Sequence, residues 1–163
     1  MQYKAKAPCL VESYWQIDEV LDGDSIIVKN LFKNERKEIR LYGIDAPETK
    51  INRKMKEDEE KSHLPAELLL KLGFKALKYV LKVAPPKTIV TIITEESNFY
   101  DYYNRQLGYI ILPNGKCLNE LILKNGHAKA THKYYCGNLA EYQAINRKAQ
   151  IKKLGMYRKI RVY

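Results

Sequence analysis

The chain has 163 residues, the size of one ordinary domain, and carries 29 Lys and Arg against 19 Asp and Glu, a formal net charge of +10. Hydrophobic residues make up 45% of the sequence, which is enough to bury a core and excludes a disordered chain. Cys9, Cys117 and Cys136 form no CxxC pair and no Cys/His ligand spacing, which argues against a zinc site.

The excess of positive charge favours a polyanionic partner, because a basic surface releases condensed counterions when it binds nucleic acid. Charge alone does not identify that partner, since many basic proteins bind nothing specific. The sequence starts without the apolar stretch of a signal peptide, and no run approaches the length of a membrane span. The default expectation is therefore an intracellular monomer with no membrane partner.

Three strands are predicted in the first third of the chain. Residues 14–21 are a mixed apolar run that ends in Asp-Gly, a strong tight-turn signal. A second strand is expected over 25–28 and a third over 38–44, where apolar side chains alternate with polar ones.

A long loop and then a helix are predicted next. Residues 46–64 contain a proline and a charged run that includes the acidic segment 57–60, which favours a solvated, mobile loop. Pro65 suits the first turn of a helix, and a Pro-Pro pair at 85–86 ends it. Between them, apolar residues recur at helical spacing: Leu69, Leu72, Ala76, Val80 and Val83.

The second half of the chain contains two further strands and two helices. The β-branched run 88–94 and the apolar run 107–112 predict strands, separated by a polar, Tyr-rich turn over 98–105. A short helix is expected around 118–122 and a last helix over about 138–153, each with apolar residues on one face.

This order of elements indicates an α+β protein that is mainly a β barrel. Three strands, a helix, two strands and two helices match a five-stranded OB-fold Greek-key barrel with three helices. We expect a single domain over residues 1–163, with an N-terminal arm at 1–13. Such barrels commonly bind oligonucleotides, but a fold alone does not give a function.

Charged residues gather at the predicted strand ends. Asp24 lies between the first two strands, Arg40 is in the third, and Asp45 leaves it. Glu48 follows shortly after, and Arg105 lies in the turn before the fifth strand. If the strands close into one barrel, these ends can converge.

The convergence would suit phosphodiester hydrolysis, whose transition state carries extra negative charge on the phosphate oxygens. Carboxylates can hold a hard cation that neutralises one oxygen, and the planar fork of arginine bonds the others in pairs. A third carboxylate can position or deprotonate the attacking water. Taken singly, the same residues are better explained by a hairpin turn and a surface ion pair.

Arg40 and Asp45 are an odd number of residues apart, so an ideal strand would point them to opposite faces. Gly43 lies between them. A common site therefore predicts a bulge or a sharp bend near this glycine.

Three sequence blocks together resemble the signature of the staphylococcal nuclease family. They are Val-Leu-Asp-Gly-Asp-Ser at 20–25, Ile-Arg-Leu-Tyr-Gly-Ile-Asp-Ala-Pro-Glu-Thr at 39–49, and Asp-Tyr-Tyr-Asn-Arg-Gln-Leu-Gly at 101–108. They occur in the family's order at suitable spacing, and the resemblance extends over a core of roughly residues 15–157.

The resemblance implies a Ca²⁺-dependent endonuclease and exonuclease that acts on DNA and RNA, with single strands preferred and 3′-phosphate products. Asp24 and Asp45 match the calcium ligands of the family. Ala46 matches a position that ligates through its backbone carbonyl. The family usually has threonine there, so a hydroxyl contact is lost while the carbonyl is kept.

The resemblance also assigns the substrate-facing residues. Arg40 and Arg105 match the arginines that hold the phosphate, and Glu48 matches the carboxylate usually called the general base. Tyr103 matches a phosphate-contacting tyrosine, and Tyr134 falls near a tyrosine that packs beside the nucleotide.

Two departures and one alternative accompany this interpretation. Asn104 replaces a common glycine, and His132 stands where another tyrosine beside the nucleotide is expected. The alternative function is a non-catalytic nucleic-acid-binding module on the same OB-fold barrel. Degenerate modules of that kind typically lose the charged residues that this chain retains, which favours the enzyme.

Overall fold

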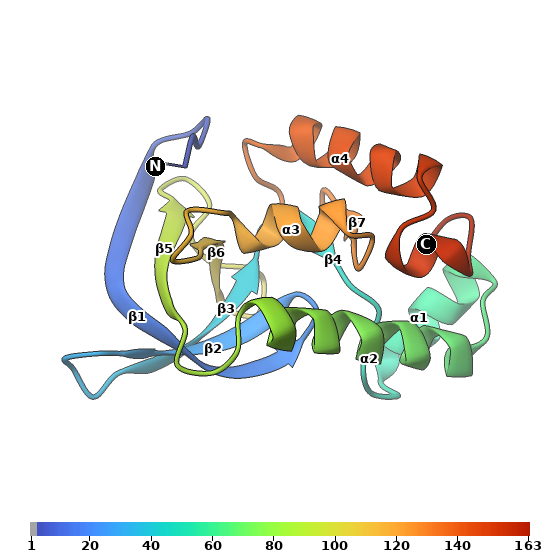
Figure 1. The fold of residues 1–163 in the computed structure, drawn as a ribbon, viewed down its shortest axis with the longest axis horizontal. Coiled ribbons are helices and arrows are strands. Elements are labelled where there is room, and N and C mark those ends of the chain that lie inside the picture. Colours follow the sequence, from blue (N-terminus) through green and yellow to red (C-terminus); the bar gives the residue numbers. More distant parts are fainter. Residues whose placement is uncertain (1–2) are drawn as a thin grey trace.

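Five strands of the computed structural model, which describes residues 3–163, close into a barrel in the order β1-β2-β3-β6-β5 (Figure 1). Strand β5 pairs back onto β1, and every pair is antiparallel except β3 with β6. The bounds are β1 (Cys9–Asp22), β2 (Ser25–Asn30), β3 (Arg36–Leu41), β5 (Ile89–Glu95) and β6 (Gln106–Ile111). The prediction of an α+β protein with a five-stranded OB-fold barrel is confirmed.

Strand β1 is long enough to pair with two neighbouring strands. Its first part pairs with β5 and its second part with β2, and the register shifts between Glu12 and Trp15. Tyr14, at this bulge, has a positive φ of 67°. Because β1 begins at Cys9, residues 9–13 of the predicted N-terminal arm belong to the barrel, while residues 1 and 2 of that arm lie outside the described residues.

Helices and two short strands surround the barrel. Helix α2 packs against β1, and α3 packs against β6 and α4. Strands β4 and β7 form a separate two-stranded sheet. The bounds are β4 (Ile44–Asp45), α1 (Arg53–Ser62), α2 (Ala66–Val83), α3 (Leu118–Lys124), β7 (Lys129–Ala130), α4 (Leu139–Ile151) and the 3₁₀ helix η1 (Gly155–Arg158).

Helix α1 corrects two sequence-based expectations, the loop over 46–64 and the count of three helices. The Asn52 side chain caps the helix by accepting a hydrogen bond from the Met55 backbone N–H at 2.8 Å. Met55 is buried, so the helix is anchored to the protein. The charged run stays largely exposed, but it is helical, and its charges pair at i,i+4 spacing: Arg53 with Glu57 and Lys54 with Asp58.

The bend predicted at Gly43 is confirmed. Strand β3 ends at Leu41, Gly43 has a φ of 70°, and β4 resumes at Ile44. A Cβ atom on Gly43 would lie 2.8 Å from the Tyr142 ring and 2.9 Å from the Cys136 sulfur. Both the backbone conformation and the lack of space therefore require glycine here.

The core consists of two apolar clusters. The larger one fills the barrel and continues beneath α2, α3 and α4. The smaller one joins α2, α4 and η1 through Leu72, Ala149, Met156, Tyr157 and Ile160. Within residues 3–163, no helix has both the length and the apolar character needed to cross a bilayer.

One contact between α2 and the segment after β4 fixes where Glu48 lies. Gly73 of α2 faces the backbone of Pro47 and Glu48. A Cβ atom at position 73 would lie only 2.2 Å from the Glu48 carbonyl oxygen. The missing side chain thus allows α2 to pack directly on the backbone that carries Glu48.

We expect Gly73→Ala to reduce the free energy of unfolding by roughly 1–3 kcal/mol, because the added methyl group overpacks the contact with Glu48. A loss of stability is the opposite of the usual effect of this substitution, since alanine in a helix interior is normally favoured over glycine by about 1 kcal/mol. Urea denaturation measures the difference. Lys78→Ala, on the exposed side of α2, is the control and should change stability by less than about 0.5 kcal/mol. A Gly73→Ala protein as stable as the parent would contradict the close contact between Gly73 and the Glu48 carbonyl.

Candidate active site

A cleft of about 620 Å³ contains every predicted site residue except Asp45 and Ala46. It is bordered by the β1–β2 turn, β3, the start of α1 and the loops around residues 103–105 and 133–134. The lining residues are Asp22, Asp24, Glu38, Arg40, Glu48, Asn52, Arg53, Lys54, Glu57, Tyr103, Arg105, Lys133 and Tyr134. Asp45 and Ala46 lie beneath this lining and contact Arg40, Lys54 and Asp24.

Asp24 is buried at the tight turn between β1 and β2. Its Oδ2 atom accepts a hydrogen bond from the Ala46 backbone N–H at 2.7 Å and lies 3.2 Å from Nη2 of Arg40. Burial raises the pKa of Asp24 well above its usual value, and the nearby Arg40 charge opposes that shift. The turn and the segment after β4 are therefore joined through this one carboxylate.

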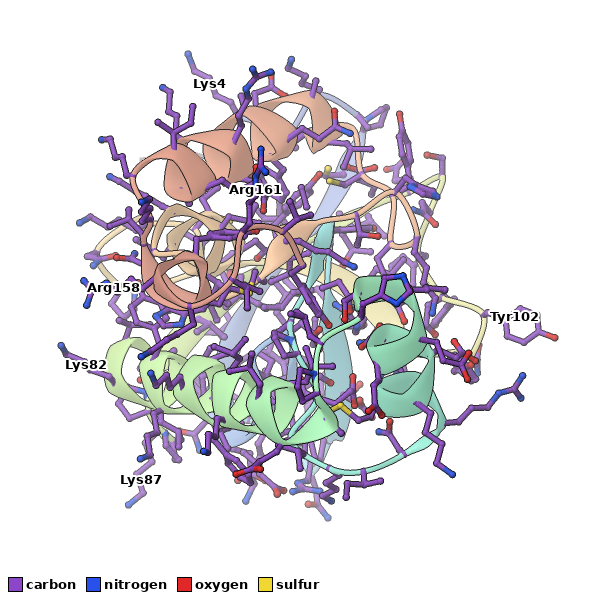
Figure 2. The ribbon with its side chains drawn as sticks, turned by 90° about the vertical axis from the view of Figure 1, so that its right-hand side faces the viewer. Lys4, Lys82, Lys87, Tyr102, Arg158 and Arg161 are labelled. Carbon is purple, nitrogen blue, oxygen red and sulfur yellow. The ribbon has the colours of Figure 1, made fainter. Side chains whose placement is uncertain are left out.

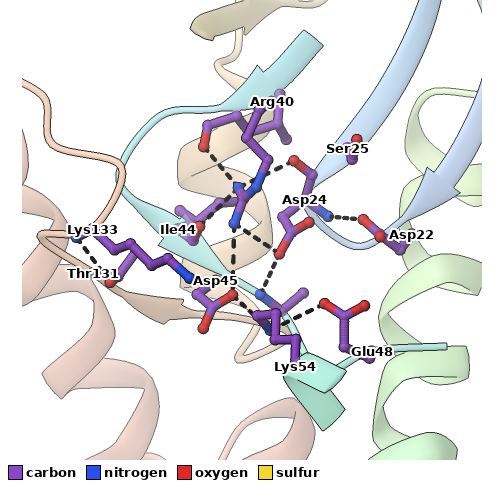
Figure 3. A network of polar contacts seen from close by, with 12 residues as sticks. Asp22, Asp24, Ser25, Arg40, Ile44, Asp45, Glu48, Lys54, Thr131 and Lys133 are labelled. Atoms are coloured by element: carbon purple, nitrogen blue, oxygen red, sulfur yellow. Dashed lines mark hydrogen bonds and ion pairs between the residues drawn. The ribbon is translucent and has the colours of Figure 1, made fainter. Parts of the chain in front are cut away.

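Arg40 is the centre of the polar network, and only 2% of its surface is exposed (Figure 3). Its Nη1 donates to the carbonyls of Leu41 and Ile44, each at 3.0 Å, and less closely to that of Asp24 at 3.3 Å. Its Nη2 faces Asp24 and, at 3.6 Å, Asp45. Burial lowers the pKa of Arg40, but the two carboxylates more than offset it, so the pKa is raised and the guanidinium stays charged.

Asp45 provides a carboxylate oxygen that lacks a directed partner. Its Oδ1 is buried and accepts no hydrogen bond from the described residues, although Nζ of Lys54 lies 3.1 Å away. Its Oδ2 lies 3.9 Å from Nζ of Lys129. A buried oxygen of this kind, close to a second carboxylate, suits a hard cation better than it suits a settled ion pair.

The donor set around Asp45 fits calcium, which takes carboxylate oxygens, backbone carbonyls and waters. Asp24 and Asp45 could supply the carboxylates and Ala46 its carbonyl. Over residues 3–163, however, no group of three or more Asp, Glu, His or Cys side chains is already gathered as a metal cage. Part of the coordination shell would therefore come from backbone and water.

Glu48 is held at both carboxylate oxygens by residues that follow it. Oε2 accepts from Nδ2 of Asn52 at 2.9 Å, and Oε1 lies 3.0 Å from Nζ of Lys54. The sequence analysis missed Asn52 and Lys54 because it predicted a mobile loop here. The signal that could have found them was an N-cap asparagine followed by opposite charges four residues apart.

Arg105 is oriented by two acidic residues that the sequence analysis also missed. Its Nε donates to Asp101 at 2.8 Å, and Nη1 donates to Glu38 at 3.3 Å. Asn104, just before it, adopts the left-handed conformation with a φ of 61°, which asparagine tolerates. Glu38 stands two residues before Arg40 and so shares its side of β3, a spacing that the sequence displays.

The two predicted tyrosines occupy different depths. Tyr134 is buried, and its ring lies 3.7 Å from the Arg40 guanidinium carbon, a stacked cation–π arrangement. Tyr103 is 69% exposed at the rim, whereas its neighbour Tyr102 projects away from the protein (Figure 2). His132 is exposed and does not line the cleft; Lys133 does.

Comparison with known proteins identifies the family of this chain. The family model described as staphylococcal nuclease homologue matches residues 38–159, which is most of the chain. The chain therefore belongs to the staphylococcal nuclease family.

Two relatives match most of the chain. The chain is 29% identical over 153 residues to the uncharacterized protein MJ1439 of Methanocaldococcus jannaschii, covering 88% of this chain and 71% of that one. It is 33% identical over 127 residues to the endonuclease YhcR of Bacillus subtilis, covering 78% of this chain. The match spans only 10% of the length of YhcR.

We expect Arg40→Met to lower the free energy of unfolding by about 3 kcal/mol or more in metal-free buffer at neutral pH, because it leaves buried carboxylates without their counter-ion. The double variant Asp24→Asn/Arg40→Met should recover part of that loss, since one of the uncompensated charges is gone. Urea denaturation of the parent, the single variants and the double variant gives the coupling. Strictly additive losses would show that Arg40 does not serve as the counter-ion of Asp24.

Proposed function

We propose that this protein is a Ca²⁺-dependent nuclease that hydrolyses phosphodiester bonds in DNA and RNA with little sequence preference. The observation that carries the proposal is the convergence of Arg40 and Arg105 with the carboxylates of Asp24, Asp45 and Glu48 around one cleft. Membership of the staphylococcal nuclease family and the similarity to a protein named as an endonuclease support it.

The carboxylates of Asp24 and Asp45 and the carbonyl of Ala46 would hold the calcium ion. When bound, the ion supplies positive charge to a phosphate oxygen and so stabilises the negative charge that develops during hydrolysis. This chain has Ala46 where the family usually has threonine. The role of this position is kept, because the carbonyl belongs to the backbone.

The two arginines would bind the remaining phosphate oxygens. Arg105 commits Nε to Asp101 and Nη1 to Glu38, and its Nη2 makes no hydrogen bond within residues 3–163. The committed atoms fix the plane of the guanidinium, and the free one is available to a substrate. Arg40 is held by the hydrogen bonds that its Nη1 donates to backbone carbonyls. Both guanidinium groups are therefore oriented before the substrate arrives.

Glu48 would orient and deprotonate the attacking water. The water oxygen adds to phosphorus, its proton passes to the Glu48 carboxylate, and the bond from phosphorus to the 5′ oxygen breaks. That oxygen then takes up a proton, leaving a 5′-hydroxyl on one product and a 3′-phosphate on the other. Asn52 and Lys54 hold Glu48 in the metal-free protein, so one of these contacts has to loosen for the water to reach it.

The tyrosines explain the expected lack of sequence preference. Tyr103 at the rim would contact a phosphate, and Tyr134 would pack beside the nucleotide. Phosphate contacts and aromatic packing do not read base edges. An unpaired strand can expose its bases to such contacts more readily than a duplex, which favours single-stranded substrates.

A digestion assay on single-stranded DNA, double-stranded DNA and RNA tests the proposal. We expect all three to be cleaved with Ca²⁺, the single strands fastest, and cleavage to stop when the ion is chelated. The products should carry 3′-phosphates, so a polymerase should extend them only after phosphatase treatment. Full activity in chelator would contradict the metal dependence. Tight binding without cleavage would instead support the alternative, a non-catalytic nucleic-acid-binding module.

We expect Arg105→Ala to lower turnover by about 10²-fold or more, the typical loss for one transition-state donor. Arg36→Ala is a matched control, because Arg36 also pairs with two acidic side chains, Asp18 and Glu19, but lies outside the cleft. Its turnover should stay close to that of the parent. Steady-state kinetics on single-stranded DNA separates an effect on turnover from an effect on KM. A rise in KM with unchanged turnover would assign Arg105 to docking alone.

A further inference from the structure

Lys54 places its ammonium group among three carboxylates that come from different segments. Its Nζ lies 3.1 Å from Oδ1 of Asp45, 3.0 Å from Oε1 of Glu48 and 3.0 Å from Oδ2 of Asp58. Figure 3 shows it reaching from the start of α1 toward Asp45 and Glu48. Two of these carboxylates belong to the proposed catalytic set, as one calcium ligand and the general base.

We propose that Lys54 is a built-in competitor of the divalent cation: its ammonium group neutralises Asp45 and Glu48 in the metal-free protein and must withdraw for the cation to bind. The inference rests on the proposed function, because it takes Asp45 as a metal ligand. It goes beyond it by assigning a regulatory role to a lysine of α1.

The fold holds Lys54 in this position. Its side chain is not a freely solvated one that happens to lie near a carboxylate. The Asn52 side chain caps α1 and also donates to Glu48, so the first turn of the helix is tied to that carboxylate. Only 23% of the Lys54 side chain is exposed. Asp58, one turn further along α1, is held in turn by a hydrogen bond from the Tyr163 hydroxyl at 3.0 Å.

Electrostatic repulsion sets the Lys54 ammonium group against a metal ion at Asp45. Burial lowers the pKa of Lys54, but Asp45 and the other acidic groups raise it further, so the lysine is charged at neutral pH. A divalent ion on Asp45 would lie within a few ångströms of this charge, where the repulsion between like charges is strong and poorly screened. Both cations would draw on the negative charge of the same carboxylate, so the presence of one weakens the binding of the other.

The structure also provides a place for Lys54 once it withdraws. Asp45 Oδ1 contacts the ammonium group without a directed hydrogen bond, so this contact is the weaker one. The contact with Asp58 is a directed hydrogen bond at 3.0 Å between residues four apart on one helix. Lys54 can therefore release Asp45 and Glu48 while it keeps Asp58 as its partner.

Calcium binding to the protein alone, followed by isothermal titration calorimetry without substrate, tests the inference. Lys54→Met keeps the apolar stem and removes the charge, and we expect it to bind Ca²⁺ about tenfold more tightly than the parent, or better. Lys56→Met removes the same charge from an exposed position of α1 and should change the affinity by less than about twofold. Lys54→Gln is a second variant, and thermal unfolding followed by circular dichroism verifies that each protein is folded.

Asp45→Asn separates failure of this inference from failure of the proposed metal site. If Asp45→Asn weakens binding but Lys54→Met and Lys54→Gln leave it unchanged, the metal site stands and the competition is refuted. Weaker binding in the Lys54 variants would also refute it, and would make Lys54 a residue that positions the carboxylates. If Asp45→Asn binds Ca²⁺ as the parent does, the metal site of the proposed function is itself wrong, and the inference with it.

Discussion

The buried guanidinium of Arg40 lies beside two carboxylates and needs fixed hydrogen-bond acceptors. The bend at Gly43 provides backbone carbonyls as these acceptors. The bend ends β3 and turns the carbonyls of Leu41 and Ile44 toward Nη1. It also returns Asp45 to the side of the chain that Arg40 occupies, against the alternation of a regular strand. The β1–β2 turn is then fixed in place because Asp24 bonds both Arg40 and the backbone of Ala46. A side chain at position 43 would crowd Tyr142 and Cys136 and strain a positive φ, so this bend favours glycine.

The carboxylates of the cleft are paired with cationic side chains of the protein itself. Arg40 faces Asp24 and Asp45 from one direction, and Lys54 faces Asp45 and Glu48 from another. Isolated buried carboxylates would be costly, so these tethered cations allow the fold to keep an acidic site ready. On the proposed function, a cation and a phosphate would have to replace contacts that already exist. The contacts that stabilise the cleft would then oppose the binding of the metal ion.

The parts of this structure that follow from local patterns were predictable from the sequence. Alternating runs and turn dipeptides indicated the five barrel strands, and the odd spacing of Arg40 and Asp45 indicated the bend at Gly43. Helix α1 was not predicted, because a densely charged segment was interpreted by its composition and not by the pairing of its charges at i,i+4. The roles of Lys54 and Asp101 depend on which side chains meet after folding, as does the approach of Gly73 to the Glu48 carbonyl. Periodicity shows which face of a helix is buried but not what lies against it.

We propose the Asp24–Arg40–Asp45 network as the metal and phosphate site of a nuclease. Its most direct test is the rate of single-stranded DNA hydrolysis as a function of Ca²⁺ concentration, measured for the parent and for Asp24→Asn. We expect the variant to need a much higher Ca²⁺ concentration for half-maximal rate and to reach a lower maximum, because one carboxylate ligand is lost. Superimposable Ca²⁺ dependences for the two proteins would contradict it.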